Sequence, residues 1–326
     1  MNDNSRLVDG GDLDALVRRV DDLCATRDWD ALADLHRRCR AALDTGRQLW
    51  PVAVLAAHRL ALGAPPAIAV QALEDPGTFG IGPLTEVLAS RATWAELEPH
   101  LPPGAARALV AHERVARGED LTGADIGHDP LDGLALRPHP WEPGWPVATY
   151  TDDAVTVPEP APVAGTPLDL PEAESDLGPD ATTAALRGCV EHWASASNGR
   201  VEVVAVRGTA RTAIASLGVR TAAGSDIDTA DALGRLAWAS ASGAAHARRR
   251  GAARGRFDAW WFAACALGLD DDWPLDPDEL APGVGELRAV AWRPRTPPSG
   301  WELHLAVEDP VEGVAWAISA TDERLT

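Results

Sequence analysis

A proline-rich acidic segment, residues 128–181, divides this 326-residue chain into two parts. It holds 11 of the 26 prolines, and 11 acidic residues against a single arginine. Proline interrupts helices and central strands, and like charges repel one another along an extended chain. We therefore expect residues 128–181 to be a linker between one domain at residues 1–127 and a second domain at residues 182–326.

The first domain is predicted to be all α-helical. Apolar residues recur every three or four positions, the pattern of helices with one buried face, in residues 12–28, 29–44, 49–64, 83–91, 93–101 and 103–119. The first of these segments is expected to bury Leu13, Val17, Val20 and Cys24. A Trp-x-x-Leu pattern occurs at both Trp29 and Trp94, and the short helices resemble the helical hairpins of TPR and HEAT repeats. This resemblance implies a repeat-like array.

The second domain is predicted to be α+β. Helical patterns cover residues 182–199 and 227–269, the latter broken near Gly243. Residues 209–218 could be a short helix or the return strand of a hairpin, and their alanines favour the helix. Strands are predicted at residues 200–208, 287–292, 301–307 and 314–318. From Trp301 to Val307 apolar residues alternate with polar ones, and short turns favour an antiparallel meander of the last three strands. The predicted fold is therefore multidomain: an all-α helical-hairpin domain, then an α+β domain with a small, mainly antiparallel sheet.

Five arginines lie within residues 248–256 of a chain whose net charge is −20. If residues 246–262 form one helix, its advance of about 100° per residue places most of these arginines on one face with aromatic side chains. Arginine stacks on aromatic rings and forms paired hydrogen bonds with carboxylates and phosphates. The candidate anion-binding residues are His246, Arg249, Arg250, Arg254, Arg256 and Trp260.

The same arginine face also suits a structural role. The chain has 49 acidic residues, so its arginines have many carboxylates to meet, among them those of the acidic segment 128–181. A binding site requires the side chains to converge on an open pocket, whereas a structural role places them against the chain's own carboxylates. The sequence leaves both interpretations open, with docking of the acidic segment favoured.

Several kinds of chemistry are excluded or disfavoured by the sequence. The chain has no lysine, which excludes the lysine of a Walker A motif, of a kinase and of a Schiff base. The cysteines, expected to be free buried thiols, are Cys24, Cys39, Cys189 and Cys265. The pair Asp226 and Asp228 suits the cap of a helix better than a metal site. No metal, no cofactor and no catalytic residue is predicted.

Composition favours an intracellular binding or scaffold protein with no evident catalytic motif. We expect a cytoplasmic protein, because the N-terminus lacks a signal-peptide pattern and no apolar run is long enough to span a bilayer. The negative charge argues against nucleic acid as a partner, and neither is a membrane expected. In the leading hypothesis, the helical domain binds a protein partner.

Two other functions stay open. One is an enzyme or small-ligand receptor that binds a small anion, a phosphate or carboxylate, at the arginine and histidine face that includes aromatic side chains. The other is a chaperone-type or immunity-type component of a toxin-defence or secretion system, with which the acidic balance of the chain is compatible.

Overall fold

The computed structural model describes residues 3–74, 80–294 and 300–323. The chain divides into two compact units, Met1–Pro130 with Ala148–Val157, and Leu131–Val147 with Pro158–Thr326. We call them the helical unit and the sheet unit. The predicted linker, residues 128–181, is distributed over both of them.

The helical unit contains α1 (Asp3–Gly10), α2 (Leu13–Thr26), α3 (Trp29–Asp44), α4 (Trp50–Gly63), α5 (Pro66–Ala69), α6 (Leu84–Arg91), α7 (Trp94–Leu97) and α8 (Ala105–Ala116), with 3-10 turns at Val70–Glu74 and Glu98–His100. The predicted helical content is confirmed, whereas the repeat-like arrangement of hairpins stays a prediction. Asp12 and Asp28 begin α2 and α3. Each carboxylate accepts a hydrogen bond from the backbone N–H three residues on, which satisfies a free donor of the first turn.

The face that α2 buries differs from the predicted one. Leu16, Val20 and Leu23 are buried, whereas Leu13 and Val17 are 40% and 37% exposed. Both stripes follow helical spacing and share Val20, so periodicity alone does not distinguish them. The packing of α2 against α3 and α4 selects the buried stripe.

A short hairpin from the proline-rich segment belongs to the helical unit. Its strands, β1 (Thr149–Tyr150) and β2 (Val155–Thr156), pair antiparallel. The Tyr150 hydroxyl donates a hydrogen bond of 2.6 Å to Glu86 of α6, whose side chain is fully buried. A ring nitrogen of His58 in α4 lies 2.8 Å from a carbonyl oxygen of the hairpin. These polar contacts hold the hairpin on α4 and α6.

The sheet unit is built on antiparallel strands β3 (Arg200–Arg207), β4 (Ala222–Ile227), β5 (Arg288–Pro294), β6 (Gly300–Asp309) and β7 (Val314–Glu323). Their order across the sheet is β3-β7-β6-β5-β4. The predicted meander of the last three strands is confirmed. Strand β4 was not predicted, because its sequence AAGSDI is rich in residues disfavoured in strands. Pairing with β5 along its whole length compensates for this.

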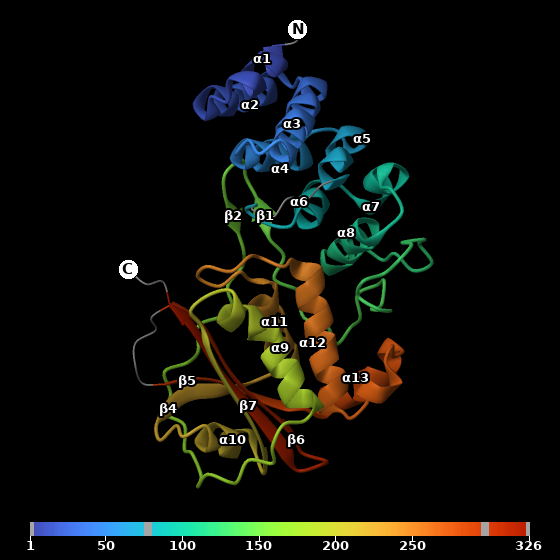
Figure 1. Cartoon of the computed structure of the whole chain (residues 1–326). Helices are drawn as coiled ribbons and strands as arrows, with labels where there is room; N and C mark the ends of the chain where they lie inside the picture. The colour runs from blue at the N-terminus through green and yellow to red at the C-terminus, as the bar shows by residue number, and fades with distance from the viewer. Residues whose placement is uncertain (1–2, 75–79, 295–299, 324–326) are drawn as a thin grey trace. The chain divides into compact units, whose positions relative to one another are not determined.

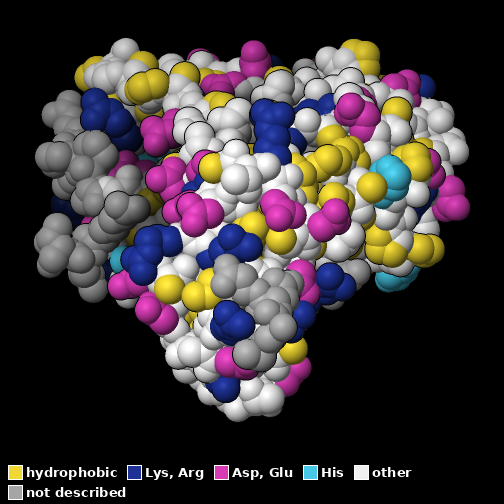
Figure 2. All heavy atoms as spheres, turned by 90° about the horizontal axis from the view of Figure 1, so that it is seen from above, with side chains coloured by type: hydrophobic (Ala, Val, Ile, Leu, Met, Phe, Trp, Pro, Cys, Tyr) yellow, Lys and Arg dark blue, Asp and Glu magenta, His cyan; other side chains and the backbone are white. Residues whose placement is uncertain are grey.

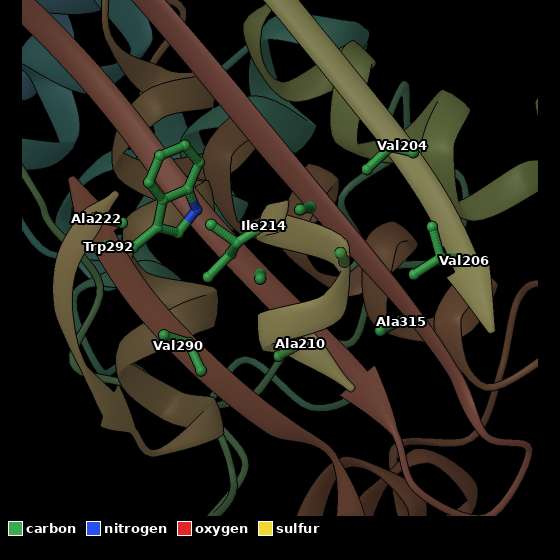
Figure 3. Close-up of a cluster of buried hydrophobic side chains, with 11 residues drawn as sticks. Val204, Val206, Ala210, Ile214, Ala222, Val290, Trp292 and Ala315 are labelled. Carbon is green, nitrogen blue, oxygen red and sulfur yellow. The ribbon is translucent and has the colours of Figure 1, made fainter. Parts of the chain in front are cut away.

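Helices cover both faces of this sheet (Figure 1). The helices of the unit are α9 (Ala181–Ser195), α10 (Ala210–Ser216), α11 (Thr229–Ala241), α12 (Ala252–Ala266) and α13 (Pro277–Glu286), with a 3-10 turn at Asp270–Asp272. Helix α10 lies on one face, α9 and α11 lie on the other, and α12 packs against both α9 and α11. Beneath α10, Ile214 and Trp292 lie side by side in a buried apolar cluster that is rich in alanine (Figure 3). The small side chains let α10 approach the sheet closely.

Part of the predicted linker covers the free edge of β4. The Leu168 N–H donates to the Ala222 carbonyl oxygen at 3.0 Å, and the Gly224 N–H donates to the Thr166 carbonyl oxygen at 2.8 Å. Leu168 also packs against the apolar cluster beneath α10. The segment therefore protects an edge strand that would otherwise offer unpaired backbone groups to another chain.

Replacing Tyr150 with Phe removes the hydroxyl that donates to the buried Glu86. We expect the free energy of unfolding of the helical unit to fall by about 1–3 kcal/mol, because a buried polar group then loses a partner. Chemical denaturation measures the change. Thr149→Val is the matched control, since Thr149 is exposed on the same strand. Equal stability of the two variants would contradict a structural role for the hydroxyl.

Candidate functional site

The arginine-rich stretch is not one helix. Helix α11 ends at Ala241, and α12 begins at Ala252 after Gly251, whose φ of +96° belongs to the left-handed region that favours glycine. The expected helix over residues 246–262 is therefore corrected to a loop followed by a helix. His246 is exposed in this loop, and Arg249 is partly exposed in it.

Arg256 is fully buried and fastens part of the predicted linker to α12. Its guanidinium forms two hydrogen bonds with the Glu142 carboxylate, at 2.7 and 3.1 Å, and the Glu142 side chain is 2% exposed. It also donates to the carbonyl oxygens of Ala135 and Arg137, at 2.7 and 3.0 Å. The ring of Trp260 lies 5.2 Å from the guanidinium carbon. All these contacts are of the kind expected if the arginine face has a structural role.

Two more arginines share one carboxylate. Asp258 lies 3.3 Å from Arg250 and 2.8 Å from Arg254, and it accepts a hydrogen bond from the Ser240 hydroxyl. A ring nitrogen of His192 lies 3.4 Å from Arg250. Burial and the nearby positive charge of Arg250 lower the pKa of His192 to about 4, so this ring is neutral at neutral pH.

The six predicted residues therefore do not meet at one place. Arg256 and Trp260 lie against residues 135–142, while Arg250 and Arg254 surround Asp258. Of the six, Arg254 lines a cavity of 490 Å³ together with Phe257, Trp261 and Trp273. Anion binding at this face stays a prediction, but Arg250, Arg254 and Arg256 already meet carboxylates of the chain.

A different cavity opens where two neighbouring strands diverge. The β5–β6 ladder ends at the pair Ala291 and Leu305. Strand β5 nevertheless continues to Pro294 along β4, and β6 begins at Gly300 along β7. A cavity of 840 Å³ lies beside these separated ends. We call it the split-sheet cavity, and its volume is typical of small-molecule sites, which measure about 300–1,000 Å³.

The split-sheet cavity combines aromatic rings with charged side chains. It is lined by Trp292, Arg293 and residues 300–304 of the strands, by Arg235 and Trp238 of α11, and by residues 159–163. Trp238 stacks on Trp301 with ring centres 5.1 Å apart. Trp292 packs against His304 at 4.7 Å. The walls are therefore flat and largely apolar.

Four residues of this lining carry a buried side-chain nitrogen without a hydrogen-bond partner in the described part of the chain. The atoms are Trp238 Nε1, Trp292 Nε1, Arg293 Nε and His304 Nε2. Buried polar groups nearly always have a partner, and an unsatisfied one costs about 1–3 kcal/mol. These four atoms are closed to solvent, so they lie behind the cavity wall and a molecule in the cavity cannot reach them.

Arg293 lines the cavity and has no ion pair with another described residue. Arg235 pairs with Asp231 at 3.2 Å and donates to the Ala161 carbonyl oxygen at 2.8 Å. Arg293, by contrast, is partly exposed and has neither an ion pair nor a hydrogen bond within the described ranges. His304 adds no charge at neutral pH, because burial lowers its pKa to about 4.

Sequence reasoning missed this site because its residues come from distant segments. The alternating pattern correctly placed Trp301 and His304 on opposite faces of a strand, and the cavity reaches both through the gap between β5 and β6. One local signal was present in the sequence: Pro294, the last residue of β5, lacks the N–H that would extend the ladder toward β6.

The other sequence candidates have structural explanations. Of the two aspartates predicted as a helix cap, Asp228 caps α11, accepting from a backbone N–H at 2.6 Å, and Asp226 forms an ion pair with Arg211 at 3.1 Å. All the cysteines are free, but Cys24 is only partly buried, unlike the buried thiol that was predicted. Among the residues that the structure describes, no three His, Cys, Asp or Glu side chains are placed to hold a metal ion. On the face that Figure 2 shows, arginines are interspersed with acidic side chains.

No helix within the described ranges is both long enough and apolar enough to pass through a bilayer. The described helices are short: α3, among the longest, has 16 residues, whereas a spanning helix needs about 20 apolar residues.

The fold and the cavity define a protein of mixed helix and sheet content with a small antiparallel sheet and a cavity of ligand size. A family model described as "Family of unknown function (DUF6183)" matches residues 14–324. The match covers nearly the whole chain, and the chain therefore belongs to this family. A search of curated proteins and a search of solved structures each found no match.

Breaking the buried ion pair of α12 should destabilise the sheet unit. Arg256→Gln leaves the Glu142 carboxylate buried without its charge partner, and we expect a loss of about 3–5 kcal/mol in the free energy of unfolding. The double variant Arg256→Met/Glu142→Leu removes both charges and should recover most of this loss. Chemical denaturation measures both, with Arg187→Gln on an exposed position of α9 as control. If the double variant is no more stable than Arg256→Gln, the account of the pair is wrong.

Two buried histidines should make stability depend on pH. The pKa of His192 and of His304 is lowered from 6.5 to about 4 in the folded chain, mainly by burial. As the pH falls below about 6.5 the unfolded chain binds protons first, so the folded state loses stability between about pH 6.5 and pH 4. At about pH 5 the expected loss is on the order of 2 kcal/mol for each histidine.

Denaturation of His304→Gln at about pH 7 and about pH 5 tests this dependence. The variant should lose less stability than the wild type over this interval, because one of the two titrating groups is gone. His246→Gln is the control, since His246 is exposed. An equal loss in the wild type, His304→Gln and His246→Gln would contradict the account.

Proposed function

We propose that this chain is a small-ligand-binding protein and that the split-sheet cavity is its binding site. The observation that supports this most is the combination, in one cavity of 840 Å³, of tryptophan side chains with Arg293, which is partly exposed and has no ion pair with another described residue. A cavity of this size that joins an apolar wall to a few polar groups is typical of small-molecule sites.

We place the ligand in this cavity and not at the arginine face that the sequence suggested. There, Arg256 is matched by Glu142, and Arg250 and Arg254 are held by Asp258. An anion at that face would compete with carboxylates that are already in place. In the split-sheet cavity, Arg293 has no ion pair with another described residue, although Glu159 and Glu302 also line the cavity.

A catalytic role has weaker support. His304 lies 3.2 Å from the Ser319 hydroxyl and 3.8 Å from a Glu302 carboxylate oxygen, which are the residue types of a nucleophile, a base and an orienting acid. However, the carboxylate is beyond hydrogen-bond distance. Burial also lowers the pKa of His304 to about 4, which makes the ring a weak base at neutral pH. Binding without catalysis is the simpler account.

Binding of a protein partner by the helical unit is the second candidate. One observation favours it: Leu13 and Val17, one turn apart on α2, are 40% and 37% exposed. Side chains at this spacing are neighbours on a helix surface and form one apolar strip. The strip contains only two residues, so the cavity remains the stronger basis for a binding function.

We also propose that the protein works in the cytoplasm. Its four cysteines are free, and Cys39, Cys189 and Cys265 are buried. Burial raises the pKa of the Cys39 thiol to about 11, so this thiol is unreactive at neutral pH. Free thiols of this kind are typical of proteins in reducing compartments.

Filling the cavity provides the direct test. Val163 lines the split-sheet cavity, and Val163→Trp should occupy it without removing a buried hydrogen bond. A ligand-observed NMR screen of a fragment library with acidic, basic and neutral compounds should yield fragments that bind the wild type but not Val163→Trp. The reason is steric, because the added indole takes up the ligand's space.

Val311→Trp is the matched control, because it introduces the same ring at a position that is 77% exposed. This variant should bind the same fragments as the wild type. If the library yields no binder, or if every binder also binds Val163→Trp, the cavity is not a ligand site. Both variants are first checked for wild-type thermal stability, so that a folding defect is recognised.

A further inference from the structure

We infer that a second cavity of the sheet unit binds a small molecule that carries a quaternary ammonium group. This cavity measures 490 Å³ and is lined by parts of α9, of α12 and of the chain that follows α12, and we call it the α9–α12 cavity. It shares no lining residue with the split-sheet cavity, so the inference is independent of the site proposed there. Three properties lead to it: open ring surface, net negative charge, and few free hydrogen-bond acceptors inside.

Three aromatic rings form a corner in the α9–α12 cavity. Phe257 and Trp261 lie one turn apart on α12, and each stands nearly at right angles to Trp273, at 85° and 87°, with ring centres 5.8 and 5.7 Å apart. All three residues are partly exposed and line the cavity. The indole N–H of Trp273 donates to the Asp132 carbonyl oxygen at 2.9 Å, which holds this ring in place. A small group in such a corner meets two rings at once.

Rings of this kind attract cations, and the chain itself provides an example. The guanidinium carbon of Arg254 lies 5.1 Å from the centre of the Phe257 ring, a cation–π contact. Trp261 and Trp273 have no such contact with an arginine of the described residues. Tryptophan is the side chain that attracts cations most strongly. The two indole rings are therefore available to a cation from outside the chain.

The charge around the cavity is negative. The lining contains three carboxylates and one guanidinium, those of Asp132, Asp258, Asp270 and Arg254. Asp258 lies 2.8 Å from Arg254 and 3.3 Å from Arg250, which stands outside the lining. The carboxylates of Asp132 and Asp270 have neither an ion pair nor a hydrogen bond with the described residues. Three carboxylates against two guanidiniums leave a net charge of −1, which one monovalent cation balances.

The hydrogen-bonding groups favour a cation without N–H groups. An ordinary ammonium group has three N–H donors, and burying them without acceptors is costly. The buried carboxylate of Asp258 is already used by two arginines and by the Ser240 hydroxyl. The free carboxylates belong to the more exposed residues Asp132 and Asp270. A quaternary ammonium group has no N–H to satisfy, and its methyl groups pack directly on the rings.

Helix α9 leaves room for such a group. Its part of the lining consists of the small residues Ala184, Ala185 and Gly188. A Cβ atom added at Gly188 would meet no atom of another element within 4 Å. The rings of α12 are therefore open from the side of α9.

Four probes separate these requirements in NMR titrations that follow the indole N–H signals of the full chain. Choline carries the quaternary ammonium group, and 3,3-dimethylbutan-1-ol has the same shape with carbon in place of the charged nitrogen. Ethanolamine has an ordinary ammonium group, and phosphocholine adds a phosphate that the carboxylates repel. We expect choline to bind most tightly, with each of the other three weaker by about threefold or more, the effect of a modest cation–π contact.

Ala184→Arg tests the place of binding. It puts a guanidinium of the chain beside the rings, so choline binding should be lost to a competing cation. Ala181→Arg is the matched control, because it adds the same charge at an exposed position of the same helix outside the lining. This control should bind choline like the wild type. Val163→Trp, which fills the split-sheet cavity, should also leave choline binding unchanged.

Trp261→Leu tests the role of the ring and identifies the Trp261 signal by its loss. It should weaken choline by about threefold or more, because one cation–π partner is removed. Trp50→Leu is the control, since Trp50 is 40% exposed on α4 and lies outside this lining. Should Trp261→Leu fail to fold, Ala184→Arg still decides the question, because Ala184 is exposed.

Several results would overturn the inference. They are a titration in which choline shifts no indole signal, another probe that binds as tightly as choline, and choline binding that survives Ala184→Arg. Unchanged choline affinity in folded Trp261→Leu would overturn it as well. None of these results bears on the split-sheet cavity, whose own test is the fragment screen with Val163→Trp.

Discussion

The ion pair between Arg256 and Glu142 is buried, with the two side chains 0% and 2% exposed, and it joins α12 to the proline-rich segment. A buried charge is tolerated only when it is paired and its remaining hydrogen-bonding groups are satisfied. Arg256 meets this condition through two carbonyl oxygens as well as the carboxylate. Residues 135–142 are therefore held against α12 by the ion pair and by two backbone hydrogen bonds.

The sheet of the same unit contains two neighbouring strands that pair over only part of their length. Strands β5 and β6 give up ladder hydrogen bonds beyond Ala291 and Leu305, although each strand continues beside its other neighbour. Separated strands expose side chains of both sheet faces to one space, which neither face could offer alone. Unsatisfied donors buried behind that space lower the stability of the unit.

Features set by neighbouring residues could be predicted from the sequence. The alternation from Trp301 to Val307 predicted a strand of the meander, and a helix cap was predicted at Asp226 or Asp228, of which Asp228 forms it. Features set by distant partners could not. The start of α12 depends on the left-handed backbone of Gly251, and β4 depends on its pairing with β5.

The same distinction explains the sites. The arginine stretch could be recognised by composition, but only the fold shows which carboxylates its side chains meet. The split-sheet cavity depends on where one ladder ends and on the stacking of Trp238 of α11 against Trp301 of β6. Neither property has a local sequence pattern, since both arise from contacts between segments far apart in the chain.

A crystal structure of the protein with a brominated fragment from the ligand screen would test the central claim most directly, because bromine can be located by its anomalous scattering. The account predicts a bromine peak inside the split-sheet cavity, beside Trp301. A cavity that stays without ligand density at saturating fragment, or a bromine peak only at the arginine face near Asp258, would contradict it.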